Sequence, residues 1–526
     1  MNKDPHKDSN TAPTGTVRAY HQRTKHQFER YAEGPGSLDW DAQPDPFRTW
    51  AGTRWYGLPR QTPARQIAWS ALAAQRAPEP FDTDNLSACL RLCVAITAWK
   101  EYAGNRWALR AHPSSGNLHP TETWVIAYWV DGLADGLYHY QCRDHSLEWR
   151  ASSVTASNQP GLWLGFSSIT WREAWKYGER AFRYCQLDMG HVLAAVAHAA
   201  ALFGWQARLV SLPPEAVAHC LGTDRAEDYA GVEAEEADVI VALHAGESRD
   251  VLFPPLNWDE WSGVPSLLDP RPLYQWPVID EVAAASRGPL PVFHQTEVDR
   301  PAPEARADEL AATRVLLQRR SAQAFDGGSI LPAPVFRRIL ASLLPTGAGP
   351  VWRMWQATPR VHPVLLAHRV EGLPAGLYIL PRSESGLTGL GAALRQEFEW
   401  ASADAELPLY RLISARAERT ARNLSCHQDI AAMSAFTLMF IAEFDAPIDA
   451  DPAAYRHLHW EAGMLGHCAT LEAEAAGWRG TGIGCFFDDA VHEVLGLTDT
   501  RWQVIYHYAI GMPVDDARLL TLPAYA

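Results

Sequence analysis

The sequence has few cysteines and little positive charge. None of its eight cysteines lies in a Cys-x-x-Cys pair, so we expect buried free thiols in a reducing compartment rather than a disulfide framework. Lys and Arg number 46 against 61 Asp and Glu, which gives a net charge of -15. This balance argues against nonspecific binding to nucleic acid.

Long apolar runs and common catalytic signatures are also missing. No stretch approaches the ~20 apolar residues that cross a bilayer, and the N-terminus lacks the apolar region of a signal peptide. We therefore expect a cytoplasmic protein without a membrane partner. The chain has no Gly-x-Ser-x-Gly, Walker or His-Glu-x-x-His motif. His457 and His459 have no third ligand at metal spacing, so we predict no metal site.

What the chain does contain is a set of landmarks that recur in the same order in its two halves. At 526 residues and 47% apolar content it is globular and too long for one core. Recurrence in order predicts a duplicated domain. The paired landmarks are Arg23-Thr24 and Arg320-Ser321, His119-Pro120 and His362-Pro363, Gly136 and Gly376, Gly190 and Gly463, Gly204-Trp205 and Gly477-Trp478, and Leu221-Gly222 and Leu495-Gly496.

The duplication sets the expected domain boundaries. We predict a disordered lead over residues 1–17, a first domain over 18–285, a linker rich in proline and charge over 286–309, and a second domain over 310–526.

Helical and strand patterns are mixed without a regular βαβ period. Apolar residues follow helical spacing near Gly190 and near Gly463. The mixture favours an α+β fold. The expected strands are residues 123–130, 238–245, 438–444 and 502–511.

Two stretches in the second half are candidates for ligand binding. "QRRSAQAF" places Arg319, Arg320 and Ser321 before an expected helix, and guanidinium groups with a hydroxyl suit a phosphate. The alternative is an exposed basic turn. "RGTGIGCFFDD" follows a helix rather than a strand, which argues against a dinucleotide fingerprint. Its glycines still allow a backbone to lie flat against a ligand; the alternative is a simple helix-to-strand loop.

Two stretches in the first half complete the candidates. "WKYGERAFRY" joins Lys176 to Tyr177; a desolvated lysine has a lowered pKa and a nearby tyrosine can pass a proton. A solvated charged face is the alternative. "RAHPSSGNLHPTETW" is a loop rich in proline and serine before an expected strand.

Together these stretches resemble the FMN-dependent nitroreductase superfamily, in particular its SagB/ThcOx branch of dehydrogenases. The resemblance implies two tandem nitroreductase-like domains, with a mixed or antiparallel sheet flanked by helices, that form an intramolecular pseudo-dimer. It also implies FMN as cofactor and Lys176 and Tyr177 as the catalytic pair. The residues that it assigns to FMN are Arg319, Arg320, Ser321, Gly480, Gly482, Ile483, Gly484 and Arg518 from the second half, and Pro113, Ser114, Ser115 and Asn117 from the first.

The resemblance leaves a choice of activity. The leading expectation is oxidation of a small-molecule or peptide-derived, azoline-like substrate by hydride transfer to FMN. The alternatives are an NAD(P)H-dependent nitro- or quinone reductase, and a non-catalytic flavin-binding or partner-recruiting protein. The mirror-image site lacks a Ser-Ser-x-Asn loop, so one FMN per chain is expected. The chain is expected to be a monomer with an internal pseudo-dimer, or a homodimer.

Overall fold

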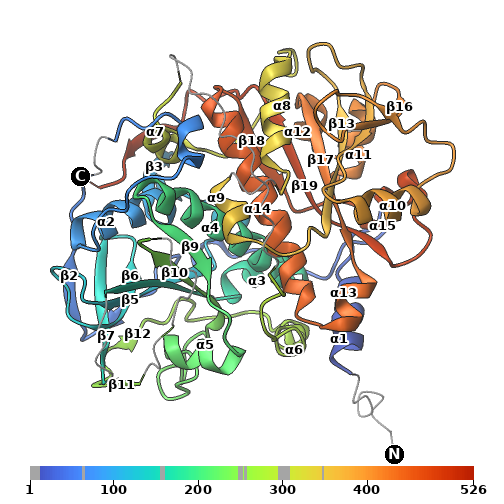
Figure 1. Ribbon diagram of the computed structural model, residues 1–526. Helices are drawn as coiled ribbons and strands as arrows, with labels where there is room; N and C mark the ends of the chain where they lie inside the picture. The colour runs from blue at the N-terminus through green and yellow to red at the C-terminus, as the bar shows by residue number, and fades with distance from the viewer. Residues whose placement is uncertain are drawn as a thin grey trace, which may run out of the picture.

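The computed structural model describes residues 12–61, 65–154, 160–246, 253, 257–293, 309–345 and 349–525. Two sheets stand on either side of a central layer of helices, one in the N-terminal half (residues 12–293) and one in the C-terminal half (residues 309–525) (Figure 1). The expected α+β class is confirmed. Two helices of 22 residues, α4 (Ala181–Leu202) and α14 (Ala454–Ala475), pack against each other between the sheets.

The two sheets share the order of six strands. In the N-terminal half the order is β11-β7-β6-β5-β8-β10-β9, and in the C-terminal half it is β15-β16-β14-β13-β17-β19-β18. The run from β7 to β9 corresponds strand by strand to the run from β16 to β18, whereas the edge strands differ, because β11 follows β10 in the chain and β15 precedes β16. All these pairings are antiparallel. The strands of the first sheet are β5 (Thr121–Tyr128), β6 (Gly136–Gln141), β7 (Ser146–Ser153), β8 (Gly161–Ser168), β9 (Gln206–Leu209), β10 (Glu236–His244) and β11 (Trp258–Asp259), with β2 (Arg54–Gly57) beside β7.

The second sheet contains two of the expected strands. Residues 502–511 coincide with β19, and residues 438–444 overlap β17. Residues 123–130 and 238–245 likewise overlap β5 and β10 in the first sheet. The strands of the second sheet are β13 (Val361–Ala367), β14 (Gly376–Ile379), β15 (Ala401–Ser402), β16 (Tyr410–Ser414), β17 (Phe436–Glu443), β18 (Arg479–Ile483) and β19 (Trp502–Gly511).

The remaining helices flank these layers. In the N-terminal half they are α1 (Pro13–Arg23), α2 (Thr83–Cys93), α3 (Trp171–Tyr177), α5 (Pro214–Leu221) and α6 (Pro277–Ala285). In the C-terminal half they are α7 (Ala312–Gln318), α8 (Ala333–Ser342), α9 (Pro350–Met354), α10 (Glu384–Ala393), α11 (Glu418–Leu424), α12 (Asp429–Met433), α13 (Asp445–Ala450) and α15 (Asp488–Leu495).

Helices α4 and α14 cross at a pair of glycines. A Cβ at Gly463 would overlap the carbonyl oxygen of Leu187 and the Cα of Gly190, and a Cβ at Gly190 would overlap the Trp460 carbonyl. Because both positions lack a side chain, the two backbones come into direct contact. Every residue of α4 is buried, so this helix is the centre of the core. The landmark glycines thus mark the crossing point of the two halves.

Each half also extends a terminal segment onto the other. The C-terminal strand β20 (Leu520–Pro523) pairs with β3 (Ile96–Tyr102), which pairs with β4 (Asn105–Arg110). In return, the chain after α1 forms a bridge between His26 and Phe487 at the start of α15. The two halves are therefore joined through these two exchanged segments as well as through the central helices.

The structure corrects one domain boundary. Residues 13–17 were expected in the disordered lead, but α1 begins at Pro13, because proline fits the first turn of a helix and Val17 and Tyr20 pack in the core. Residues 1–11 lie outside the described residues, as do residues 294–308 of the expected linker. Within the described part of the chain, no helix has the length and apolar character needed to cross a bilayer.

Candidate functional site

A cavity of about 1260 Å³ opens between the halves and receives side chains from both. It is larger than the ~300–1,000 Å³ of ordinary ligand pockets. Its wall brings together most of the predicted site residues, although they come from four separate segments. These residues are Pro113, Ser114, Ser115, Asn117, Lys176, Tyr177, Arg319, Arg320, Ser321, Gly482, Ile483 and Gly484.

Arg319 links the two halves at one end of the cavity. Its guanidinium donates hydrogen bonds to the carbonyl oxygens of Ala111 (2.7 Å) and Arg110 (2.9 Å), just before the 113–117 loop. The side chain is buried, and its Nη1 has no hydrogen-bond partner among the described residues. A buried guanidinium nitrogen without a partner is costly unless an anion completes it. This end of the cavity is therefore suited to an anionic group.

Two other arginines stand beside Arg319. Arg320 donates to the Thr97 hydroxyl at 2.9 Å and to backbone carbonyls, so much of its donor capacity is used inside the protein. Arg479, which the sequence did not single out, lines the cavity and forms ion pairs with Asp515 (2.5 Å) and Glu474 (3.8 Å).

Arg518 lies off the cavity wall, contrary to its predicted place in the phosphate site. It pairs with Asp516, two residues away (2.7 Å), and its guanidinium lies over the Tyr102 ring. The nearby carboxylate and the aromatic face hold the exposed side chain at the surface.

The glycines of β18 and Gly484, the residue that follows it, allow other side chains to pack closely against this segment. A Cβ at Gly482 would overlap the Tyr506 hydroxyl, and one at Gly484 would overlap the Tyr184 ring. Gly480 is not part of the wall: the space beside it is filled by Thr470 and Tyr508. Its carbonyl accepts the Ala322 N–H at 3.1 Å, which ties β18 to the arginine stretch.

The 113–117 loop has an unusual backbone, with φ of 58° at Gly116 and 60° at Asn117, followed by 55° at His119. Left-handed conformations at non-glycine residues cost energy and need support. Asn117 supplies it: its Nδ2 donates to the Ala108 carbonyl (2.9 Å) and its Oδ1 lies 3.0 Å from the His119 ring. Asn117 thus holds the loop in shape, although it also lines the cavity.

The predicted catalytic pair packs directly on this loop. A Cβ at Gly116 would lie 2.5 Å from the Tyr177 hydroxyl and 3.2 Å from Lys176 Nζ. Both residues come from the last turn of α3. Burial lowers the pKa of Lys176, which brings the free amine closer to neutral pH, and burial raises the pKa of Tyr177, which keeps its proton in place. The lysine is suited to accept a proton and the tyrosine to donate one.

Two buried acids support the loop and α3, and neither was predicted from the sequence. Asp188 on α4 accepts hydrogen bonds from the Ser115 N–H (3.0 Å) and from its hydroxyl (3.0 Å). Burial raises the pKa of Asp188 to about 7, and burial together with the charge of Asp188 raises the pKa of Glu173 well above its ordinary value. Ser115 is therefore already engaged by protein, and Asp188 is a further titratable group on the cavity wall.

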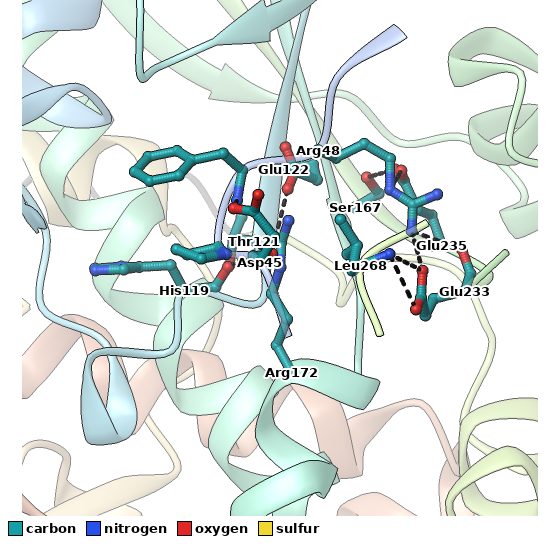
Figure 2. A network of polar contacts seen from close by, with 12 residues as sticks. Asp45, Arg48, His119, Thr121, Glu122, Ser167, Arg172, Glu233, Glu235 and Leu268 are labelled. Atoms are coloured by element: carbon teal, nitrogen blue, oxygen red, sulfur yellow. Dashed lines mark hydrogen bonds and ion pairs between the residues drawn. The ribbon is translucent and has the colours of Figure 1, made fainter. Parts of the chain in front are cut away.

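A buried ion network fixes the distance between α3 and the loop. Figure 2 shows Arg172 rising from its helix toward Glu122 and Asp45. Arg172 donates to a Glu122 carboxylate oxygen (2.5 Å), to the His119 carbonyl (2.9 Å) and to the Asp45 carbonyl (3.0 Å). One guanidinium thereby joins the helix that carries the Lys-Tyr pair to the end of the 113–117 loop and to β5.

The mirror-image position is filled by protein side chains. The counterpart of the arginine stretch is the segment from Arg23 to Lys25, and its charges form ion pairs within the protein. Arg23 pairs with Glu179, and Lys25 pairs with Asp489 (2.8 Å). The counterpart of Asp188 by repeat position is Glu461, which is paired with Arg382. These charges neutralise one another instead of facing a ligand.

Two cysteines on the cavity wall depart from the expectation of buried thiols. Six of the eight cysteines are buried, but Cys426 and Cys485 are partly exposed and both line the cavity. Sequence spacing gave no signal for this pair, because 58 residues separate their segments and only the fold brings them together.

Comparisons with known proteins found a sequence match in the C-terminal half and a structural match over nearly the whole chain. Residues 316–512 match the sequence model of the Nitroreductase family. The trifolitoxin-processing protein TfxB of Rhizobium leguminosarum bv. trifolii is 29% identical over 193 residues, which cover 32% of this chain and 52% of that protein. The similar segment thus spans about half the length of this curated relative.

A proposed nitroreductase from Anabaena variabilis matches the structure with a TM-score of 0.65 and 22% identity, over 95% of this chain and 99% of that one. The chain as a whole therefore has a nitroreductase-like fold, and residues 316–512 are similar in sequence to the Nitroreductase family.

Proposed function

We propose that the chain is an FMN-dependent oxidoreductase in which two duplicated nitroreductase-like domains build one active site. The observation that carries the proposal is the shared cavity: the cationic end comes from the C-terminal half, and the loop with the Lys-Tyr pair comes from the N-terminal half. The common strand order of the two sheets and the glycine contact between α4 and α14 support the duplication.

The residues present fit FMN. Arg319, whose Nη1 has no hydrogen-bond partner among the described residues, lines the cavity together with Ser321 and Arg479, and this set of donors suits a phosphate. Ile483, Gly484 and Tyr184 line another part of the cavity, where the Tyr184 ring packs against Gly484 and provides apolar contact for a ring system. When bound, FMN supplies a hydride acceptor, and the protein contributes orientation and proton transfer.

Within this class we favour a dehydrogenase of the SagB/ThcOx type that acts on an azoline-like group of a peptide-derived or small substrate. Removing two hydrogens from a single bond requires a base for the proton, and Lys176 has the lowered pKa that this role needs. Tyr177 can hold the substrate through its hydroxyl. Similarity to a trifolitoxin-processing protein supports a reaction that modifies a precursor.

The family match of residues 316–512 favours a second candidate, an NAD(P)H-dependent nitro- or quinone reductase. Mixing FMN-loaded protein with NADH or NADPH under nitrogen separates the two. Rapid bleaching of the flavin supports the reductase, whereas bleaching by a thiazoline-containing peptide, with loss of two hydrogens from the peptide by mass spectrometry, supports the dehydrogenase. A colourless protein that cannot be reconstituted with FMN would leave only a non-catalytic role.

Replacing the proposed base tests the dehydrogenase directly. Lys176→Met should lower the rate of peptide oxidation by about a hundredfold or more, since a positioned base contributes ~10²–10⁴-fold, while FMN remains bound. Lys100→Met is the matched control, because Lys100 also lines the cavity but donates to Thr521 on the far side. Equal rates in the two variants would contradict the role of Lys176.

A further inference from the structure

Cys426 and Cys485 reach the cavity from two segments that the structure ties together. Cys426 follows α11, and Cys485 follows β18. The Gln428 side chain donates to the carbonyl oxygens of Ser425 (3.0 Å) and Cys485 (3.1 Å), which holds the two segments side by side. The backbone at Cys426 (φ 51°) and His427 (φ 60°) is left-handed, a strained arrangement that is common where a side chain is aimed for function.

A histidine completes the cluster. His26 is fixed beside Cys485 by two hydrogen bonds with Asp488: its backbone N–H donates to the Asp488 carboxylate (3.1 Å), and its carbonyl accepts the Asp488 N–H (3.2 Å). Its Nδ1 accepts the N–H of Ala32 at 2.9 Å, so the proton of the neutral ring lies on Nε2. That nitrogen is the one left to donate to the Cys485 sulfur, with which the ring interacts.

The surroundings make the two thiols unequal. The Cys426 thiol, the His26 ring and Arg180 lower the pKa of Cys485 against the opposing effect of burial, and the same contact raises the pKa of Cys426. Other ionisable groups near the pair are Tyr31, Tyr177, Tyr184 and Asp488. Cys485 is therefore the more acidic thiol of the pair, and Cys426 is the less acidic one. This is the arrangement of an attacking cysteine with a resolving partner.

We propose that Cys426 and Cys485 form a thiol–disulfide exchange site, which takes small disulfides from the cavity and closes into a reversible Cys426–Cys485 disulfide. The Cys485 thiolate attacks one sulfur of the disulfide RSSR, the S–S bond of RSSR breaks, RS⁻ leaves, and Cys485 is left in a mixed disulfide with the other R–S group. Cys426 then attacks the Cys485 sulfur and releases the second RS⁻, and the proton of Cys426 passes to one of the leaving thiolates. The protein dithiol is oxidised by two electrons, and RSSR is reduced by the same two.

The site is a dithiol rather than a metal centre. Among the residues that the structure describes, no group of three or more His, Cys, Asp or Glu side chains is placed to hold a metal ion. The proposal goes beyond the oxidoreductase function and does not require FMN.

The first test uses glutathione disulfide with the full chain, both flavin-free and flavin-loaded, under nitrogen. We expect two glutathione thiols to be released per chain and one disulfide to appear between the peptides of Cys426 and Cys485 by mass spectrometry, reversed by dithiothreitol. Cys426→Ser should stop at a glutathione adduct on Cys485. Cys220→Ser, at a buried thiol, should behave like the natural chain. The proposal would be overturned if no Cys426–Cys485 disulfide forms. It would also be overturned if this disulfide forms no faster than glutathione adds to the buried cysteines.

The second test measures alkylation of Cys485 by iodoacetamide against pH. An ordinary thiol slows by about a hundredfold between pH 8 and pH 6; Cys485 should slow by less than about threefold. His26→Ala removes the Nε2 donor and should make the decrease steeper, and Cys426→Ala, which removes the larger effect, should make it steeper still. A steep profile in the natural chain would overturn the assignment of the thiolate. Because both tests can be run without flavin, their failure is distinguishable from failure of the proposed oxidoreductase function.

Discussion

At the scale of single residues, Arg319 has two roles that an ordinary surface arginine does not have. It holds the backbone before the 113–117 loop and keeps one buried nitrogen free for an anion. Arg319→Ala should weaken FMN binding by about 10- to 100-fold, which is the loss of a charge-assisted hydrogen bond of ~1.5–3 kcal/mol. Fluorescence titration with FMN measures the Kd.

The control for Arg319 is Arg314→Ala, because Arg314 is an exposed arginine one and a half turns earlier that bonds only to Gln318 within its own helix. Its loss should leave the Kd unchanged. If both variants bind FMN like the natural chain, the cationic end of the cavity is not a phosphate site.

Asp188 should make stability depend on pH in the neutral range. Burial raises its pKa to about 7 from an ordinary value of 3.8. Between these values the folded protein holds a proton that the unfolded chain has released, so this group's contribution to the free energy of unfolding decreases as pH rises from about 4 to 7 and then levels off. The decrease should be roughly 2–4 kcal/mol.

Urea unfolding at pH 5 and pH 8 measures this effect by difference. Asp188→Asn keeps the hydrogen-bonding shape but cannot ionise, so the natural chain should lose more stability between the two pH values than the variant does. Equal losses would mean that Asp188 titrates like an exposed carboxylate.

The sequence could identify those parts of the cavity wall that are short continuous stretches. It could not identify single residues that only the fold brings to the wall. Arg319, Lys176 and the 113–117 loop each belong to a short stretch with its own chemical pattern. Asp188 and Arg479 carry no local pattern, since a lone acid on an apolar helix and a lone arginine after one are common. Their place on the wall depends on how α4 and β18 pack, which is set by contacts between distant segments.

At the scale of elements, prediction succeeded where one physical signal dominates. Strand β19 is buried along its whole length and was located to the residue, and α4 and α14 follow a long helical period. Short edge strands such as β9 and β11 were missed, because two to four residues carry no measurable period. Strand β20 was missed as well, since four mostly exposed residues pair with a strand more than 400 positions away.

The crossing of α4 and α14 gives a prediction about packing. Gly463→Val would place a branched side chain against the Leu187 carbonyl and the Gly190 Cα, where no atom can move aside without shifting a helix. The free energy of unfolding should decrease by about 3 kcal/mol or more, at the upper end for overpacked sites.

Gly391→Ala is the matched control, since Gly391 also lies in a helix but a Cβ there meets open space. It should be neutral or stabilising by up to ~1 kcal/mol. Thermal unfolding of the two variants provides the comparison. A Gly463→Val protein as stable as the natural chain would mean that the two helices do not touch at this point.

At the scale of the whole molecule, the two halves are interlocked rather than merely tethered. Strand β20 of the C-terminal half extends the β3–β4 hairpin of the N-terminal half, and the segment after α1 is bound to the start of α15. The cavity lies where these exchanges occur, so neither half encloses it alone. Under the proposed duplication, one chain contains both surfaces of a dimer, and each surface can change without the other.

The difference between the two related positions predicts how much flavin one chain binds. In one of the two related positions, Arg319 keeps a partnerless nitrogen beside a large cavity. In the other, Asp488 lies between Arg180 (3.1 Å) and Arg183 (2.8 Å), Lys25 is paired with Asp489, and Glu461 is paired with Arg382. Breaking a buried pair to admit a phosphate costs ~3–5 kcal/mol, so the second position should stay closed to FMN. Flavin absorbance after mild denaturation, divided by protein concentration, should give one FMN per chain; a ratio near two would show that these ion pairs open.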